Sequence, residues 1–426
     1  MADAIHHTTL KNGLRVIAQK LHGISGVGIS VNYRVGFRTE FRSRSGFAHL
    51  FEHMMFQGSR NVSRGEHFAR IQAFGGTVNA NTFPDSTDYY QVVPSSALEH
   101  VLELEADRMG FLDVTQDALD TQRDVVKEEI RLQVAGRPYG GFPWTVLPSV
   151  LYRKWENAHN GYGELTDLNA ATVTDCAEFF DAFYAPGNAV LAMCGDIDPR
   201  KALEAAQRCF ARVPARTVPH LPDISEPLGH EPLSGTCYDP LAPRPALAMG
   251  CRLPDAATDL STYAAHVALS HLLTSGAGAR LRSALAPLGA QVDSATGLFG
   301  PLMVKDPDTF VIVVHHPPGL ADEVVSLVTE QAAKVADGAA RGVETQRAIA
   351  TAVSRHYQNL DSLAHRVRSL ARGALLFDQP GIAEELARAV ARTKTDSLAT
   401  AAAALAQPNG RAVLALIPEE AKETAA

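Results

Sequence analysis

The chain of 426 residues has little that would place it in a membrane, on nucleic acid or among disulfide-rich secreted proteins. No apolar run approaches the roughly 18 residues that a membrane-spanning helix needs. Lysine and arginine number 39 against 47 aspartates and glutamates, and this net charge of −8 argues against a general nucleic-acid binder, which carries a basic surplus. The five cysteines form no C-x-x-C pair, and the first residues show neither the basic start nor the apolar core of a secretory signal. We therefore expect a cytoplasmic protein with reduced thiols and no nucleic-acid or membrane partner.

The composition that remains is that of an ordinary globular protein, with 46% hydrophobic and 20% charged residues. Its length exceeds what one compact domain usually holds. The segment 214–235 is rich in proline and has few periodic apolar positions, which is typical of a linker between domains. Strand and helix patterns alternate without a strict βαβ order, so we predict an α+β fold rather than a doubly wound sheet.

Short sequence matches on either side of this linker indicate two similar halves. Thr121-Gln122-Arg123 returns as Thr345-Gln346-Arg347, and Ala189-Val190-Leu191-Ala192 returns as Ala412-Val413-Leu414-Ala415, at nearly the same offset. A repeat of this length is far too long for a solenoid and favours a duplicated half. The predicted parts are 1–213, the linker 214–235, and 236–426.

The clearest chemistry lies in the run His49-Leu50-Phe51-Glu52-His53. On a helix, His49 and His53 are one turn apart on the same side, so both imidazoles can reach one ion, and Glu52 lies on the same general face. Neutral imidazole suits zinc, and a catalytic zinc site takes three protein ligands and leaves the fourth position to water. A carboxylate beside that position can accept the proton of the water. The run therefore predicts a Zn²⁺ site with Glu52 as the general base.

A third ligand has to come from another element, and a helical segment with two adjacent acidic residues can supply it. Glu128 and Glu129 lie in this segment, and spacing alone leaves both open because the rotation of the helix cannot be fixed from the sequence. A solvated face with charged pairs along the helix is the alternative reading of the same two residues.

At these positions the chain resembles the pitrilysin/insulinase family of zinc metallopeptidases, especially the mitochondrial processing peptidase branch and its short bacterial relatives. His49-x-x-Glu52-His53 is the family's inverted zincin motif. Further segments that match are 36–40, 46–49, 54–59, 75–82 and 123–130.

The resemblance extends over nearly the whole chain and implies a fold. Each half would be a mixed, mainly antiparallel sheet packed with helices, as in the processing peptidases. Residues 1–213 would form the zinc-binding catalytic half, and 236–426 a degenerate, non-catalytic repeat.

The resemblance also implies roles for individual residues. His49, His53 and Glu129 would bind one Zn²⁺ per chain, with Glu128 as a variable neighbour, and Glu52 would be the general base.

A strand of the first half would bind the substrate. By the same resemblance, Val78, Asn79 and Ala80 would hold a peptide as an added β-strand through backbone hydrogen bonds. Because this mode of capture needs an extended chain, folded proteins would be poor substrates.

The second half keeps too few of these residues to hold a metal. Aligning Gly276 with Gly58 places His271 opposite His53, but Ser270 opposite Glu52 and Val267 opposite His49. In the repeat of the third-ligand helix, Val353 stands where Glu129 stands. We interpret His271 as a hydrogen-bonded polar residue of a structural half.

Two departures from the family pattern affect the expected activity. Gln122 stands where the family usually has a glutamate, two helical turns before Glu129, where it would lie beside the ligands and affect their orientation and basicity. The arginine–tyrosine pair that relatives carry in the non-catalytic half is also missing, since the matching positions fall near Ala286 and at Val292 or Asp293.

The missing pair bears on possible partners. In short bacterial relatives that act as pairs, one subunit has the zinc motif and the other has the arginine–tyrosine pair. The resemblance thus implies a homologous partner subunit that carries this pair, in a heterodimer, with a homodimer as the other possibility.

The expected function is zinc-dependent endopeptidase cleavage of extended or unfolded peptides, in general oligopeptide degradation or in the processing of a leader or precursor. The alternative from a different class is a catalytically silent, or partner-dependent, scaffold subunit of a peptidase-like complex. Gln122 is the feature that favours this alternative.

Overall fold

The computed structural model describes residues 4–218, 220–227, 229, 231–340 and 342–419. Pro219, Leu228 and His230 of the predicted linker, Arg341 of the second predicted half, and the ends at 1–3 and 420–426 lie outside the described residues.

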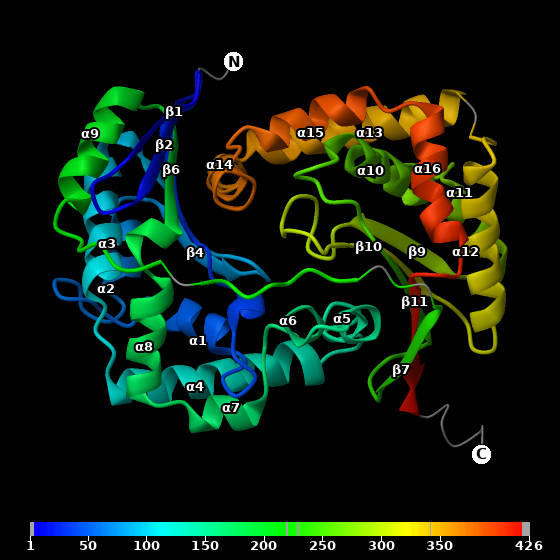
Figure 1. Cartoon of the computed structure of the whole chain (residues 1–426), viewed down its shortest axis with the longest axis horizontal. Helices are drawn as coiled ribbons and strands as arrows, with labels where there is room; N and C mark the ends of the chain where they lie inside the picture. Colours follow the sequence, from blue (N-terminus) through cyan, green and yellow to red (C-terminus); the bar gives the residue numbers. More distant parts are fainter. Residues whose placement is uncertain (1–3, 219, 228, 230, 341, 420–426) are drawn as a thin grey trace. The chain divides into compact units, whose positions relative to one another are not determined.

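The described strands belong to two sheets, and helices cover the sheets (Figure 1). The strands are β1 (His6–Thr9), β2 (Arg15–Lys20), β3 (Gly26–Tyr33), β4 (Thr77–Thr82), β5 (Thr87–Pro94), β6 (Ala189–Gly195), β7 (Leu233–Asp239), β8 (Ala246–Arg252), β9 (Gln291–Thr296), β10 (Thr309–His315) and β11 (Arg411–Pro418). The helices are α1 (Phe47–Met54), α2 (Glu66–Ala73), α3 (Leu98–Phe111), α4 (Gln116–Ile130), α5 (Leu147–Leu151), α6 (Trp155–Ala158), α7 (Leu165–Ala170), α8 (Val173–Phe183), α9 (Pro199–Phe210), α10 (Leu260–Thr274), α11 (Arg280–Leu285), α12 (Ala321–Ala336), α13 (Gly342–Asp361), α14 (Leu363–Phe377), α15 (Ile382–Ala391) and α16 (Thr395–Ala406). None of these helices combines the length and the apolar character needed to span a bilayer.

The two sheets repeat one strand order. The first sheet runs β1-β2-β6-β3-β5-β4, and the second runs β7-β11-β8-β10-β9. In each sheet a single parallel pair, β2 with β6 or β7 with β11, joins an otherwise antiparallel arrangement. Apart from the additional strand β1, every strand of one sheet has its counterpart in the other. This confirms the predicted α+β fold with two similar, mainly antiparallel halves.

The chain folds into two compact units, and each unit takes one segment from the other half of the sequence. Unit 1 consists of Met1–Glu128, Gly161–Pro222 and Gln358–Ala383. Unit 2 consists of Glu129–Asn160, Asp223–Tyr357 and Glu384–Ala426. The predicted halves 1–213 and 236–426 describe the order of the elements along the chain, and the compact units differ from them by this exchange.

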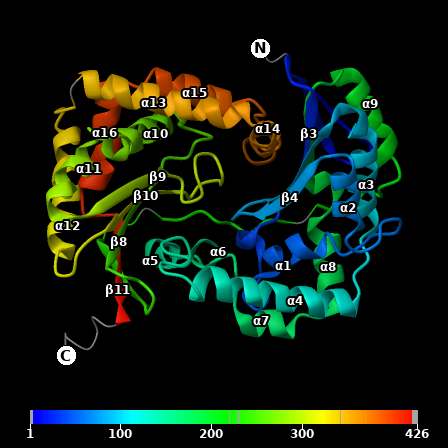
Figure 2. The same ribbon diagram turned by 180° about the vertical axis from the view of Figure 1, so that it is seen from behind.

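The exchanged segments cover one face of each sheet. In unit 1, α14 packs on β3 and β6, while α3 and α9 pack on the opposite face, as Figure 2 shows. In unit 2, α5 packs on β7, β8 and β11, while α10 and α16 lie on the other side of the sheet. Apolar side chains of α14 and of α5 join the respective cores, so the central strands of each sheet are buried on both faces, as a layered fold requires.

Glycines in the strands allow these helices to approach closely. A Cβ atom at Gly28 of β3 would lie 3.1 Å from Val367 of α14, and one at Gly250 of β8 would lie 3.0 Å from Leu147 of α5. Glycine inside a strand often marks such a close approach. The two glycines lie in the equivalent strands β3 and β8, so each sheet receives its helix at a glycine of the same strand.

Candidate metal centre and its surroundings

His49, His53 and Glu129 form a group in which one possible ligand atom from each residue lies within 4.8 Å of the others. The two imidazoles lie 5.1 Å apart between ring centroids and are nearly perpendicular. Two imidazoles and a carboxylate are a typical donor set for catalytic zinc. Among the described residues this is the one group of three or more histidine, cysteine, aspartate or glutamate side chains that could hold a metal ion, and its chemistry fits Zn²⁺.

The N-terminus of α1 is fixed by a residue with a left-handed backbone and by a buried carboxylate. Gly46 precedes the helix at φ +83°, and a Cβ atom there would lie 2.6 Å from the carbonyl oxygen of Tyr162, so glycine is required at this position. The Glu40 carboxylate accepts hydrogen bonds from the backbone N–H groups of Gly46, at 2.9 Å, and Ala48, at 2.8 Å. It thereby satisfies N–H groups that a helix N-terminus leaves without partners, and its charge suits the positive end of the helix dipole.

The opposite side of α1 is held by an aromatic cluster. Phe51 packs against Phe179 and Tyr184, with ring centroids 4.8 and 5.5 Å apart. The Tyr89 hydroxyl donates to the carbonyl of Phe51, at 3.4 Å, and lies 3.1 Å from the Tyr184 hydroxyl. Burial, with a further contribution from Glu52, raises the pKa of both tyrosines above the ordinary value. Both phenols therefore stay neutral, and α1 packs against a closely packed aromatic cluster.

The orientation of α4 distinguishes Glu128 from Glu129, the two candidates between which the sequence did not decide. Gln122 and Val126 are buried, and Glu129 continues the same stripe at the spacing of a helix face. Glu128 is exposed, whereas Glu129 is half-buried and belongs to the cluster. Glu129 lies in the last turn of α4, just before a π-helical turn at Arg131–Ala135. The geometry thus favours Glu129 over Glu128.

Gln122 is buried at 7% exposure on the face of α4 that carries Glu129. Seven residues correspond to about two helical turns, so both side chains leave the helix on the same side. The expected place of Gln122 beside the ligands stays a prediction. A neutral amide at this place alters the charge around the ligands without removing one of them.

The predicted substrate strand lies at an edge of its sheet. Val78, Asn79 and Ala80 belong to β4, which pairs only with β5 within the described part of the chain. The Ala80 N–H donates to the Asn79 side-chain oxygen at 2.8 Å, so this group points away from β5. Because alternate residues of a strand point their backbone groups to the same side, Val78 also faces the open edge. Their role in binding a substrate stays a prediction.

Three residues that contact α1 or the glycine before it have no role predicted from the sequence. Thr82, at the end of β4, donates its hydroxyl to Glu52 Oε2 at 2.7 Å. Glu40 fixes the start of α1, and the Tyr162 ring lies 5.3 Å from the His49 ring. Thr82 and Glu40 lie inside segments that carried the family resemblance, so a signal existed for them. For Tyr162 the sequence held none.

In the second half, which lacks the ligand set, the residues opposite His53 and Glu52 make hydrogen bonds of their own. His271 Nδ1 lies 2.8 Å from the Ser275 hydroxyl, and burial together with Arg355 lowers its pKa to about 4. Ser270 lies 2.9 Å from Ser294 between the two hydroxyl oxygens. These contacts confirm that His271 is hydrogen-bonded, and the structural role of its half stays a prediction.

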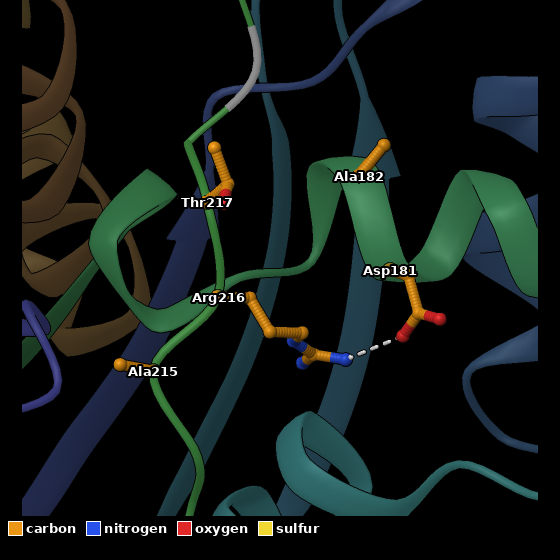
Figure 3. A pocket seen from close by; sticks show the side chains of 5 residues that line it. All are labelled: Asp181, Ala182, Ala215, Arg216 and Thr217. Atoms are coloured by element: carbon orange, nitrogen blue, oxygen red, sulfur yellow. Dashed lines mark hydrogen bonds and ion pairs between the residues drawn. The ribbon is translucent and has the colours of Figure 1, made fainter.

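An open pocket of about 790 Å³ on unit 1, shown in Figure 3, includes none of the cluster residues. Arg216 in this pocket pairs with Asp181 at 3.2 Å and donates to the carbonyls of Met109 and Tyr184. Its guanidinium therefore anchors the first part of the segment 214–235 to unit 1. We assign no chemistry to this pocket.

Two family patterns match consecutive parts of the chain. Residues 15–136 match the family described as insulinase (peptidase family M16), and residues 170–351 match the one described as peptidase M16 inactive domain. The chain belongs to the M16 insulinase family. The insulinase match contains the residues of the metal-type cluster, and the inactive-domain match follows it along the chain.

Individual relatives agree with this membership. The M16 chain is 33% identical over 211 residues to zinc protease PqqE of Helicobacter pylori. This alignment covers 47% of this chain and 46% of that protein. It is 24% identical over 210 residues to the mitochondrial-processing peptidase subunit beta of Saccharomyces cerevisiae, covering 49% and 45%. The chain thus matches about half the length of these curated relatives.

Solved structures extend the similarity to the whole fold. A protease from Helicobacter pylori superposes with a TM-score of 0.86 at 25% identity, over 97% of this chain and all of that one. An M16 inactive-domain protein from Pseudomonas fluorescens gives 0.83 at 18% identity, over 97% and 98%, and this likeness shows the fold alone. The M16 chain is therefore a peptidase-type protein in family and fold.

Proposed function

We propose that this M16 chain is a zinc-dependent metalloendopeptidase that hydrolyses extended or unfolded peptides. The observation that carries the proposal is the convergence of His49, His53 and Glu129 within 4.8 Å, with Glu52 on the same helix, α1, as the two histidines. His49, His53 and Glu129 would hold one Zn²⁺. When bound, the ion would polarise the peptide carbonyl and acidify a water molecule.

The proton transfers would then fall to Glu52. As the general base, its carboxylate would take the proton of the attacking water and pass it to the nitrogen of the leaving amine. The carboxylate is half-buried and already accepts a hydrogen bond from Thr82, so it needs little reorganisation before the reaction.

Substrate would bind along the open edge of β4. Backbone groups of Val78 and Ala80 would pair with an extended peptide, which places its peptide bonds beside the helix that carries Glu52, since α1 packs on β4. The Asn79 side chain would release the Ala80 N–H to the incoming strand. Both oligopeptide degradation and removal of a leader use substrates of this extended kind.

This proposal is tested with one peptide sequence in two states. The purified chain is incubated with an unstructured reporter peptide and with the same sequence inside a stable folded protein. Cleavage of the free peptide alone, abolished by a zinc chelator and restored by added zinc, supports the proposal. Equal cleavage of both, or cleavage in the presence of the chelator, would contradict it.

A partner-dependent enzyme is the second candidate, and two arginines of unit 2 favour it. Arg280 pairs with Glu344, and Arg282 donates to the backbone carbonyl of Thr274, so both are engaged within this unit. No tyrosine stands seven residues beyond either of them. We propose that a homologous subunit supplies the arginine–tyrosine pair in a heterodimer.

Mass in solution and activity separate the two candidates. A monomer or homodimer that cleaves the peptide alone would overturn the requirement for a partner. A chain that binds zinc but cleaves only after the homologous subunit is added would support it.

The thiols are consistent with a reducing compartment, and we propose a cytoplasmic location. All five cysteines are free, and burial raises the pKa of Cys176, Cys194 and Cys251 to about 12. Such thiols are poor nucleophiles and act as small core residues. Imaging of a tagged full chain in cells tests the location.

A further inference from the structure

Thr82 makes the hydrogen bond that links the edge strand to the motif helix. It is the last residue of β4, and its hydroxyl oxygen lies 2.7 Å from Glu52 Oε2 and 3.5 Å from the carbonyl oxygen of Ala48. A hydroxyl has one proton to donate. The proton goes to Glu52, because the contact is shorter and the acceptor is charged.

The second half contains the same threonine without the glutamate. Thr296 is the last residue of β9, the edge strand that corresponds to β4, and its hydroxyl donates to the carbonyl of His266 on α10 at 3.2 Å. The alignment that sets His271 opposite His53 sets His266 opposite Ala48 and Ser270 opposite Glu52. The structural bond of this threonine is thus to a helix carbonyl.

The comparison between the halves isolates what is special in unit 1. Where no acid is present, the threonine fastens the end of the edge strand to the helix backbone. Where Glu52 is present, the hydroxyl turns to the carboxylate, and the carbonyl contact lengthens from 3.2 Å to 3.5 Å. The threonine hydroxyl therefore joins the end of the edge strand to the helix in both halves. Only in unit 1 does this hydrogen bond go to the carboxylate that would act as the general base.

We propose that Thr82 is a positioning residue for Glu52, one that fixes the carboxylate relative to the strand that receives the substrate. The inference rests on the proposed function, because positioning matters only if Glu52 acts as the base. A glutamate side chain has several rotatable bonds, and a hydrogen bond to one carboxylate oxygen restricts them. Because Thr82 belongs to β4, the base and a peptide bound to β4 share one rigid element, as precise catalytic geometry requires.

Three variants test this role in the zinc-loaded full chain, with any partner subunit that activity requires. Thr82→Val removes the hydroxyl and keeps the shape, and we expect kcat to fall roughly 10- to 100-fold, with KM and zinc content nearly unchanged. Thr82→Ser keeps the donor and should restore most of kcat. Thr296→Val makes the same change in the half without a base and should leave kcat at the wild-type value.

The outcomes that overturn the proposal are equally distinct. A wild-type kcat in Thr82→Val would overturn it, and so would a loss that Thr82→Ser fails to rescue. An equal loss in Thr296→Val would show that the threonines act only through the fold.

Crystal structures of the zinc-loaded wild type and of Thr82→Val provide a readout that needs no activity. We expect one Glu52 conformer, hydrogen-bonded to Thr82, in the wild type, and a displaced or multiple carboxylate in the variant. An unmoved Glu52 in Thr82→Val would refute the positioning role even if the proposed function holds. A wild type that cleaves nothing under any condition would instead refute the proposed function, while the Glu52 conformers would still decide the positioning.

Discussion

At the scale of single residues, the rotation of α4 decides which of two adjacent acids serves the cluster. Glu129 follows Val126 on the inward face, and Glu128 is turned to solvent. The two residues differ by about 100° around the helix axis, which is enough to separate a ligand from a surface charge. The pair thus offers a variant and its matched control in neighbouring positions.

We expect Glu129→Ala to weaken zinc binding by more than about 100-fold, because loss of a direct ligand costs more than loss of one of its supporting partners. Glu128→Ala should bind zinc as the wild type does. Metal titration of both purified variants measures this. Zinc loss in Glu128→Ala but not in Glu129→Ala would show that Glu128 is the third ligand.

A second residue-scale prediction concerns Gln122. Gln122→Glu restores the acid that the family usually carries on this buried face of α4, so we expect zinc to stay bound and peptide hydrolysis to be held or increased. Zinc content and kcat, measured together, check this. A sharp fall in kcat with zinc retained would show that the amide itself is required.

At the scale of the element, α1 depends on groups that are distant from its histidines. Glu40 accepts two backbone N–H groups at the start of the helix while only 4% exposed. The sequence predicted the helix and its ligand spacing, because these are local. It did not predict the partner of its N-terminus or of Glu52, because such contacts depend on how the β4–β5 hairpin and the segment before α1 meet in space.

We expect Glu40→Ala to lower the free energy of unfolding by about 1–3 kcal/mol, the cost of leaving buried N–H groups without an acceptor, and to weaken zinc binding as α1 loosens. Asp198→Ala is the control, because Asp198 accepts two N–H groups at the start of α9. Denaturant unfolding and metal titration should show a modest loss of stability and unchanged zinc affinity in this control. Unchanged zinc affinity in Glu40→Ala would contradict the account.

At the scale of the whole molecule, the duplication was visible in the sequence and the exchange of segments was not. Two short matches at nearly the same offset predicted paired halves, and the strands that contain one of them, β6 and β11, occupy equivalent places in the two sheets. The exchanged segments are 129–160 and 358–383, and the sequence does not indicate on which sheet each of them packs, because both sheets offer the same kind of face.

The pH dependence of stability also belongs to the whole molecule, since buried histidines are spread over both units. Burial, with Arg108 nearby, lowers the pKa of His67 well below its ordinary value, and burial lowers those of His266 and His271, the last to about 4. Below pH 6.5 the unfolded chain therefore binds more protons than the folded one, and stability falls as the pH falls from about 6.5 towards 4.

We expect the urea midpoint of the metal-free chain to be lower at pH 5 than at pH 7, and His271→Gln to reduce this difference. A chelator keeps release of metal out of the comparison. Equal midpoints at the two pH values would contradict the prediction.

The central claim is that His49, His53, Glu129 and Glu52 form a working zinc peptidase centre. The measurement that tests it most directly is zinc content and hydrolysis of an unstructured reporter peptide in parallel, for the wild type and for Glu52→Gln, with any partner subunit that activity requires. We expect one zinc per chain in both proteins and hydrolysis by the wild type alone. Hydrolysis that persists in Glu52→Gln, or a wild-type chain that binds no zinc, would contradict it.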